Sequence, residues 1–245
     1  VMVNVVTRTD DPDTINKIAD ALLEQFPRIT TIVNNINDKR NPTAVGRYEN
    51  VVYGSGYITD YIGDYKYVLH ANSFFQTNTS QAEKLYDKAL EYANIQPDET
   101  VFDLYCGVGS ISLAASSAAK KVTGIEIEKV AVRNARTNVE QNDVGNVEIV
   151  QGDLKDTFND DFISKHGRPD VLFTDPPRAG MHEDVVQQLC QLQIPRIVYI
   201  SCDSSTMARD IKKLNELYEI EEVQPVDMFP QTYHIETVAS LRLRQ

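Results

Sequence analysis

Residues 101–109 have the sequence VFDLYCGVG, in which an apolar strand pattern runs directly into two closely spaced glycines. Glycine permits a tight turn and lets the backbone approach a ligand closely. After this stretch, strand and helix patterns alternate along the chain, which predicts a parallel sheet with helices on both faces. In such sheets ligands bind at the carboxyl ends of the strands, so the turn at Gly107 is a candidate binding site.

The alternation continues through five strand–helix units and closes with two consecutive strands. Strands are predicted at 101–104, 122–127, 147–150, 171–174 and 196–201, and helices at 81–93, 110–119, 129–141, 184–192 and 206–217. The last two strands, 219–228 and 235–243, are joined by a short connection, so the final strand runs antiparallel to its neighbour. This layout predicts a Rossmann-like α/β fold of the class I methyltransferase type, with seven strands and an antiparallel last strand.

The first part of the chain shows a different pattern and is predicted to be a small α+β domain fragment. One amphipathic helix begins near Asp10 and ends near Pro27. Strand patterns surround it at 1–6, 31–35, 51–53, 57–62 and 66–69. We therefore expect two domains, 1–79 and 80–245, the second being the Rossmann-like domain.

Composition limits the class of protein. The 245 residues carry a net charge of −12, and 42% are hydrophobic, which is enough for a core and excludes disorder. No apolar run has the ~18 residues that a membrane span needs, and the start lacks signal-peptide features. The first residue is not methionine, which suggests a fragment or a processed chain. The acidic total argues weakly against a nucleic-acid partner, unless a local basic surface exists.

The three cysteines are Cys106, Cys190 and Cys202. They are too few and too far apart for a disulfide framework, and none shows the paired spacing of a zinc or iron–sulfur site. We therefore expect an intracellular, cytoplasmic protein with no metal in this fragment.

Acidic residues end the second and third predicted strands. Glu126 lies about 20 residues after Gly107, where a carboxylate can accept hydrogen bonds from both hydroxyls of a ribose. The missing third glycine disfavours a dinucleotide and leaves adenosyl cofactors as candidates. Asp153 could accept a hydrogen bond from an adenine amino group, or it could cap the helix that follows.

The fourth strand ends in Asp175-Pro176-Pro177-Arg178. Two prolines make a rigid, extended turn that delivers the Asp175 carboxylate to the edge of the sheet. A related motif with an aromatic residue in fourth place belongs to amino-group methylases. Arg178 replaces that aromatic residue, which weakens the interpretation as an amino-group methylase.

The fifth strand ends in Ser201-Cys202-Asp203, next to a helix that Ser204, Ser205 or Thr206 could cap. Positive partial charge at the helix start favours a thiolate, which makes Cys202 a candidate nucleophile. The alternative, a small buried thiol, fits Cys106 and Cys190 better.

The closing strand begins with His234-Ile235-Glu236, whose alternation places His234 and Glu236 on one face. His-x-Glu also occurs in zinc deaminases, but their Pro-Cys-x-x-Cys partner is missing. Glu236 suits a general base facing Cys202. Alternatively, both are solvated residues at the rim of the sheet.

Five stretches, in order along the chain, resemble the bacterial RNA 5-methyluridine methyltransferases, which act on tRNA or 23S rRNA. They are residues 73–78, 103–109, 175–178 and 201–203, and Phe229-Pro230 together with 234–236. The resemblance implies S-adenosylmethionine as cofactor, Cys202 as nucleophile and Glu236 as proton acceptor. It also implies a cofactor site formed by Gln76, Tyr105, Gly107, Glu126, Asp153 and Asp175, and substrate contacts from Phe74, Phe75, Arg178 and His234.

The same resemblance implies that residues 1–79 are the later part of a central RNA-contacting domain. An N-terminal OB-like barrel is missing from the chain, and an iron–sulfur cluster is possible only in that missing part. Phe74 and Phe75 could stack on an extruded base, or one of them could belong to the core. Arg178 and a cluster of Arg209, Lys212 and Lys213 could meet phosphates, or form a solvated helix face.

We therefore expect a monomeric, cytoplasmic RNA (uracil-5-)-methyltransferase that methylates 23S rRNA. Methylation of tRNA uridine 54 is the alternative within the family. An amino-group methylase and a non-catalytic RNA-binding module are the alternatives outside it. Cytosine-5 methylation is disfavoured, because those enzymes carry Pro-Cys where this chain has Asp175-Pro176.

Overall fold

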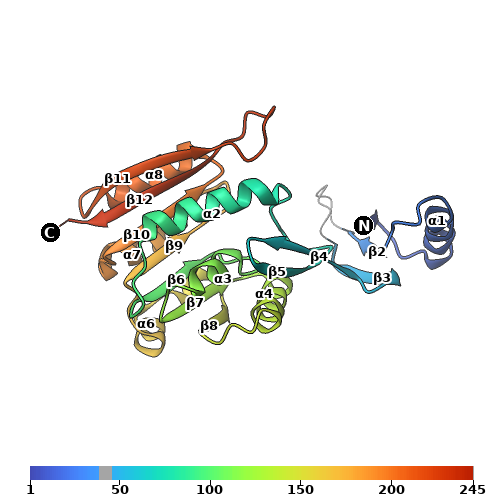
Figure 1. The fold of residues 1–245 in the computed structure, drawn as a ribbon, viewed down its shortest axis with the longest axis horizontal. Coiled ribbons are helices and arrows are strands. Elements are labelled where there is room, and N and C mark those ends of the chain that lie inside the picture. The colour runs from blue at the N-terminus through green and yellow to red at the C-terminus, as the bar shows by residue number, and fades with distance from the viewer. Residues whose placement is uncertain (39–45, 245) are drawn as a thin grey trace. The chain divides into compact units, whose positions relative to one another are not determined.

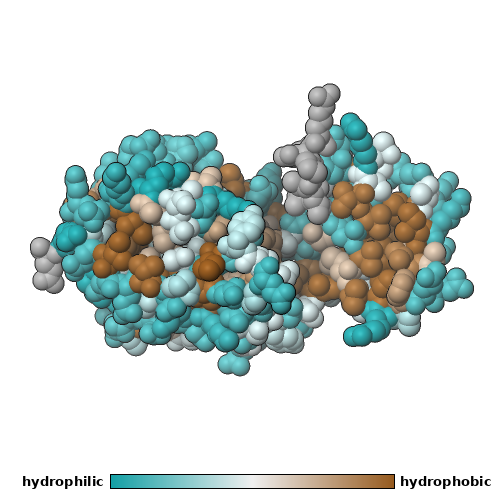
Figure 2. Space-filling view, turned by 90° about the horizontal axis from the view of Figure 1, so that it is seen from above, coloured by the Kyte–Doolittle hydropathy of each residue, from teal (hydrophilic) through white to brown (hydrophobic). Residues whose placement is uncertain are grey.

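The computed structural model describes residues 1–38 and 46–244, which fold into two compact units. The first unit contains Val1–Tyr61 and Lys66–Phe75, and the second contains Ile62–Tyr65 and Gln76–Gln245. The predicted division after residue 79 lies a few residues inside the second unit. Hydrophobic side chains reach the surface of each unit (Figure 2). None of the described helices is long and apolar enough to cross a membrane.

The first unit is built on a three-stranded sheet. Strand β2 pairs parallel with β1 and antiparallel with β3. Helix α1 begins where the Asp11 carboxylate accepts the Thr14 N–H at 3.1 Å, and its apolar side packs against the sheet. The elements are β1 (Met2–Thr7), α1 (Pro12–Gln25), β2 (Thr31–Ile36) and β3 (Tyr48–Gly54). A two-stranded sheet follows, made of β4 (Tyr57–Ile62) and β5 (Tyr65–His70).

The second unit contains a seven-stranded sheet (Figure 1). Its strands, in spatial order, are β11 (Tyr218–Val226), β12 (Glu236–Leu243), β10 (Arg196–Ser201), β9 (Val171–Thr174), β6 (Thr100–Leu104), β7 (Lys121–Glu126) and β8 (Val147–Gln151). The five strands from β10 to β8 are parallel, whereas β12 runs antiparallel to both of its neighbours. The predicted Rossmann-like fold is confirmed.

Helices cover both faces of this sheet. Three contact one face: α2 (Thr79–Ala93), α3 (Ser110–Ser116) and α4 (Lys129–Gln141). The helices on the other face are α5 (Leu154–Thr157), α6 (Asp160–His166), α7 (Glu183–Leu192) and α8 (Ser204–Leu214). Two of the predicted helices extend too far: α3 ends at Ser116 rather than at 119, and α8 ends at Leu214 rather than at 217.

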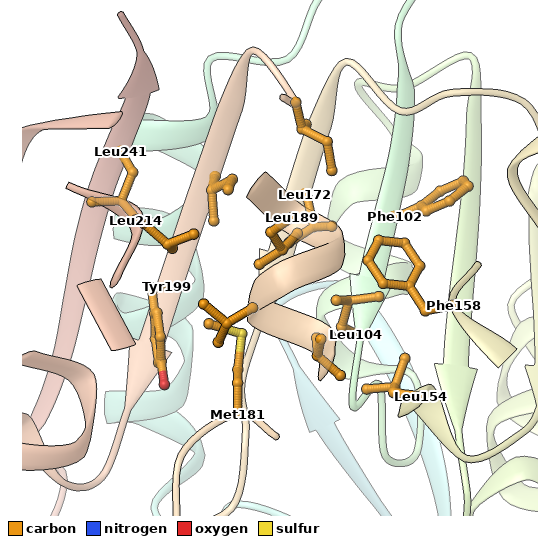
Figure 3. Close-up of a cluster of buried hydrophobic side chains, with 14 of the residues drawn as sticks. Phe102, Leu104, Leu154, Phe158, Leu172, Met181, Leu189, Tyr199, Leu214 and Leu241 are labelled. Atoms are coloured by element: carbon orange, nitrogen blue, oxygen red, sulfur yellow. The ribbon is translucent and has the colours of Figure 1, made fainter. Parts of the chain in front are cut away.

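A hydrophobic cluster joins the sheet to helices α5 to α8 (Figure 3). Alternate residues of the strands, such as Phe102 and Leu104 in β6, point into it and are fully buried. Phe102 meets Phe158 edge-on with ring centroids 6.4 Å apart. Truncating one such buried side chain to alanine costs about 2–5 kcal/mol. This packing fixes the strands, and therefore the polar residues that follow their carboxyl ends.

The order of the strands creates a switch point between β6 and β9. The chain proceeds from β6 to β7 and β8, and then returns to the other side of β6 as β9. The loops after β6 and β9 therefore leave the sheet in opposite directions and open a crevice, which is where open α/β sheets bind ligands. Tyr105 and Asp175 are the first residues beyond these two strands.

Candidate active site

Cys202 and Glu236 are brought together by the pairing of β10 with β12. The ladder pairs Ser201 with Thr237, and one further step along it places Cys202 opposite Glu236. Both side chains are partly buried, and neither belongs to the hydrophobic cluster. By contrast, Cys106 is buried and Cys190 packs against that cluster. Cys202 therefore follows the carboxyl end of β10 and lies outside the hydrophobic cluster.

Burial and two carboxylates act against a thiolate at Cys202. Burial is the largest cause that raises the pKa of the thiol, and the charges of Glu236 and Asp175 add to it. A hydrogen bond with the Arg178 side chain and its positive charge lower the pKa in part. That the helix start favours the thiolate stays a prediction, and the net effect of burial and the charged neighbours is a raised pKa of Cys202.

Two carboxyl groups near the thiol also have raised pKa values. Burial raises the pKa of Glu236, and the charge of Arg178 partly opposes this. The pKa of Asp175 is raised to about 8, first by burial, then by Glu236 and by Asp103. A carboxylate whose pKa approaches neutral is a stronger proton acceptor, which suits a general base.

Arg178 lies at the centre of this polar group. Its Nη2 lies 3.3 Å from Nε2 and 3.4 Å from Nδ1 of His234. His234 precedes β12, which begins at Glu236, so the prediction that both lie on the strand is wrong. The contact nevertheless brings His234 to the same site.

Helix α8 anchors the Pro-Pro loop that carries Arg178. The Arg209 Nη2 donates to the Ala179 carbonyl at 2.8 Å, and the Met181 N–H donates to Asp210 Oδ2 at 2.8 Å. The hydroxyl of Tyr199 donates to the same carboxylate at 2.8 Å. These bonds hold the loop in one conformation.

Gly180 is required in this loop. Its φ is +79°, and a Cβ there would lie 2.4 Å from Arg209 Nη2 and 2.6 Å from Asp210 Oδ2. The sequence analysis did not single out Asp210. Its place on the same side of α8 as the apolar residues Met207 and Ile211 could have indicated a buried acid with a structural partner.

Two members of the basic cluster on α8 have partners within the protein, and the choice between phosphate contacts and a solvated helix face stays open. Arg209 is committed to the Pro-Pro loop and to Asp210, and Lys213 donates to Glu183 at 3.0 Å. The helix cap also differs, because the Asp203 carboxylate accepts the N–H groups of Ser205 and Thr206. Ser204, Ser205 and Thr206 are therefore not the cap.

The turn after β6 forms an open cradle. Tyr105 has a φ of +63°, in the left-handed region that rarely accepts a side chain. Gly107 has a φ of +55°, and a Cβ there would meet nothing within 4 Å. The Gly107 N–H donates to Glu126 Oε2 at 2.9 Å, and the Glu128 N–H donates to Oε1 at 2.8 Å. Glu126 is thus held beside the turn, with lone pairs left for a diol.

Asp103 lies beneath this cradle and was not among the predicted site residues. It is fully buried; Ser112 Oγ donates to its Oδ2 at 2.6 Å, while its Oδ1 lacks a partner among the described residues. Burial raises its pKa to about 7. A buried acceptor of this kind is uncommon, and a role in a binding site is one physical reason for it.

The remaining predicted binding residues lie at separate places in the two units. Asp153 caps α5, accepting the Lys155 N–H at 3.2 Å, so the structure shows the capping alternative. Gln76 is buried in the second unit. Phe75, in the first unit, packs on Tyr67 with ring centroids 5.2 Å apart, while Phe74 is 76% exposed. Among the described residues no group of three or more His, Cys, Asp or Glu is placed to hold a metal.

A seven-stranded sheet with an antiparallel β12, and a glycine turn beside an anchored acid, define a class I S-adenosylmethionine-dependent methyltransferase fold. Residues 47–244 match the family model described as tRNA (uracil-5-)-methyltransferase. The chain belongs to this family, and the resemblance seen in the sequence is confirmed.

Relatives and a solved structure agree with this assignment. An uncharacterised RNA methyltransferase of Oceanobacillus iheyensis is 43% identical over 245 residues, which are 100% of this chain and 53% of that protein. An uncharacterised RNA methyltransferase of Chlorobaculum tepidum is 42% identical over 242 residues, which are 98% of this chain and 50% of that protein. The solved structure of the Pyrococcus abyssi tRNA (uracil-54, C5)-methyltransferase in complex with S-adenosyl-L-homocysteine is 32% identical and has a TM-score of 0.78. The match covers 98% of this chain and 56% of that chain. The chain thus spans about half the length of these proteins.

Proposed function

We propose that this chain is the catalytic part of an enzyme that transfers a methyl group from S-adenosylmethionine to C5 of a uridine in RNA. The observation that carries the proposal is the ladder between β10 and β12, whose last pair, Ser201 with Thr237, precedes Cys202 on one side and follows Glu236 on the other. A nucleophile and a proton acceptor on adjacent strands can act on adjacent carbons of one ring. Residues 1–79 are the RNA-contacting domain in this proposal.

The chemistry follows from the weakness of uracil C5 as a nucleophile. The Cys202 thiolate adds to C6, forming a sulfur–carbon bond and moving the electron pair of the double bond toward C5 and O4. S-adenosylmethionine, when bound, supplies the electrophilic methyl group that C5 takes. The Glu236 carboxylate then removes the proton from C5, the double bond re-forms, and the sulfur leaves as thiolate.

The residues of the cradle fit the cofactor. Gly107 leaves open space where a side chain would stand, Glu126 presents a fixed carboxylate for the ribose, and Asp103 keeps an unpartnered buried oxygen below them. We propose that Gln76, Tyr105, Asp153 and Asp175 complete this site.

The contacts of Arg178 support a role at the reacting thiol. Its guanidinium opposes the rise in the pKa of Cys202 that burial and the acids cause. We propose that Arg178 stabilises the thiolate, and that it and His234 contact the target nucleotide. Phe74, exposed in the first unit, would stack on an RNA base, whereas Phe75 is committed to Tyr67.

The substrate proposed first is 23S rRNA, modified by a monomeric enzyme in the cytoplasm. A specific observation favours a second candidate, uridine 54 of tRNA, because the solved structure similar to this chain bears that name. An amino-group methylase using Asp175 alone would keep its activity after Cys202→Ala.

Mass mapping of 5-methyluridine in cells with and without the full-length gene tests the function. We expect one 5-methyluridine of 23S rRNA to disappear without the gene, and the Cys202→Ala gene not to restore it. Loss at tRNA position 54 alone would select the second candidate. Unchanged 5-methyluridine in both RNAs would overturn the proposal.

A further inference from the structure

Tyr233 is an exposed aromatic residue three positions before Glu236. It lies in the loop between β11 and β12, which projects beyond the end of the sheet (Figure 1). Tyr233 is 88% exposed, whereas Tyr199 is fully buried. A side chain with this exposure contributes almost no hydrophobic stabilisation to the fold.

A chain of contacts connects Tyr233 to the reacting thiol. The ring centroids of Tyr233 and His234 lie 4.1 Å apart, and the two ring planes are tilted by 42°. His234 contacts Arg178 at 3.3 Å, and the positive charge of Arg178 acts on the Cys202 thiol by lowering its pKa. The two rings therefore form an aromatic surface that begins at the active site and extends outward.

Hydrogen bonds within the loop hold this surface in place. Thr232 donates its N–H and its hydroxyl to the Phe229 carbonyl, at 3.0 and 2.8 Å. The His234 N–H donates to Thr232 Oγ1 at 3.3 Å. At the start of the loop, Asn78 Nδ2 donates to the Met228 carbonyl at 2.9 Å. The exposed ring thus stands on an ordered turn, and its ordering cost on binding is small.

We propose that Tyr233 and His234 form a stacking platform for the nucleobase that flanks the target uridine in RNA. This inference rests on the proposed function. A uridine extruded for chemistry at C5 leaves its neighbours without a stacking partner. An exposed ring beside the site can take that partner's place, and it accepts any base, since every base has a π-face.

The chain contains no tryptophan, so Tyr233→Trp introduces a single fluorescent reporter at the platform. The probe is a short single-stranded oligoribonucleotide with one uridine between two adenosines, whose binding is followed separately by anisotropy of a terminal fluorescein. We expect binding to quench the tryptophan, and an oligonucleotide with abasic sites beside the uridine to bind without quenching. Val223→Trp, at a 51% exposed position on β11, is the matched control and should not be quenched.

Kinetics add a second readout. Tyr233→Ala should raise the RNA concentration for half-maximal rate by about tenfold or more, with kcat changed much less. Tyr233→Phe should restore the low RNA requirement, because the ring alone stacks. Bound RNA that leaves the tryptophan of Tyr233→Trp unquenched, or a normal RNA requirement in Tyr233→Ala, would overturn the platform and leave the proposed function standing. RNA that does not bind the unmodified chain at all would overturn both.

Discussion

Cys202 is the first residue after β10 and Glu236 is the first residue of β12, so the two lie one step beyond the last ladder pair, Ser201 with Thr237. Directly opposite residues of an antiparallel pair project from the same face, with Cβ atoms about 5 Å apart. That spacing suits two groups that act on neighbouring carbons of a single pyrimidine ring. The antiparallel direction of β12 is what brings the start of one strand to the end of the other.

Replacing Glu236 separates the two halves of the proposed reaction. Glu236→Gln keeps the size of the side chain but cannot accept the C5 proton, so the methylated adduct should form and persist. We expect turnover to fall by about 10²–10⁴-fold, while a protein–RNA complex that resists denaturation accumulates with ordinary uridine RNA. Normal turnover by this variant would exclude Glu236 as the base.

Arg178 should control the reactivity of the thiol even without RNA. Its hydrogen bond and charge lower the pKa of Cys202, so Arg178→Gln should raise that pKa and move the pH profile of iodoacetamide alkylation to higher pH. We expect alkylation of the Cys202 peptide to be several-fold slower at neutral pH, and Arg178→Lys to retain part of the effect. The Cys190 peptide of the same digest is the internal control, and equal profiles for all three proteins would contradict this role.

Asp175 should make the protein less stable as pH rises. Its pKa is about 8 in the folded protein against an ordinary 3.8, so the folded state binds the proton more tightly than the unfolded state does. Stability is therefore lost from about pH 4 to about pH 8, by an amount of the order of a few kcal/mol. Asp175→Asn cannot titrate, so its Tm advantage over the unmodified protein should grow across this window and level off above it.

A matched control for this measurement is Asp203→Asn. Cap hydrogen bonds lower the pKa of Asp203, so its carboxylate stabilises the fold above the ordinary pKa and loses this effect in acid. The Tm difference for Asp203→Asn should therefore have the opposite sign. A Tm difference for Asp175→Asn that does not change between pH 5 and pH 9 would contradict a raised pKa at Asp175.

Gly180 should matter more to activity than to folding. A Cβ at this position meets Arg209 and Asp210, the two residues that anchor the loop of Arg178. Gly180→Ala should cost about 1–3 kcal/mol of stability and lower methyl transfer at least tenfold, because the loop shifts. Gly167→Ala has a similar positive φ but open space around it, so it should lose stability alone. Equal activities in the two variants would show that the anchor is not needed.

Much of the fold could be predicted from local patterns. The strands 171–174 and 196–201 have the predicted bounds, because each is an apolar run between polar turns. The start of α8 could not be predicted, since four successive residues can cap a helix and only the backbone geometry selects Asp203.

The sequence predicts which residues follow the strand ends at the candidate site, but it does not predict the contacts between their side chains. Cys202 and Asp175 follow from the alternation of strands and helices. The raised pKa of the thiol depends first on its burial and then on the charge of Glu236, and both follow from the packing of the folded chain rather than from a local sequence pattern. The anchoring of the Pro-Pro loop by Asp210 depends likewise on a contact across 29 residues of sequence.

The most direct test of the central claim is a trapping experiment with 5-fluorouridine RNA and S-adenosylmethionine. A base cannot remove fluorine from C5 as it removes a proton, so the Cys202–C6 bond should persist and be found by mass spectrometry on the peptide that contains Cys202. Cys202→Ala should give no complex, whereas Cys190→Ala should give the same complex as the unmodified protein. RNA that binds the chain with cofactor present, yet forms no bond to Cys202, would contradict the account.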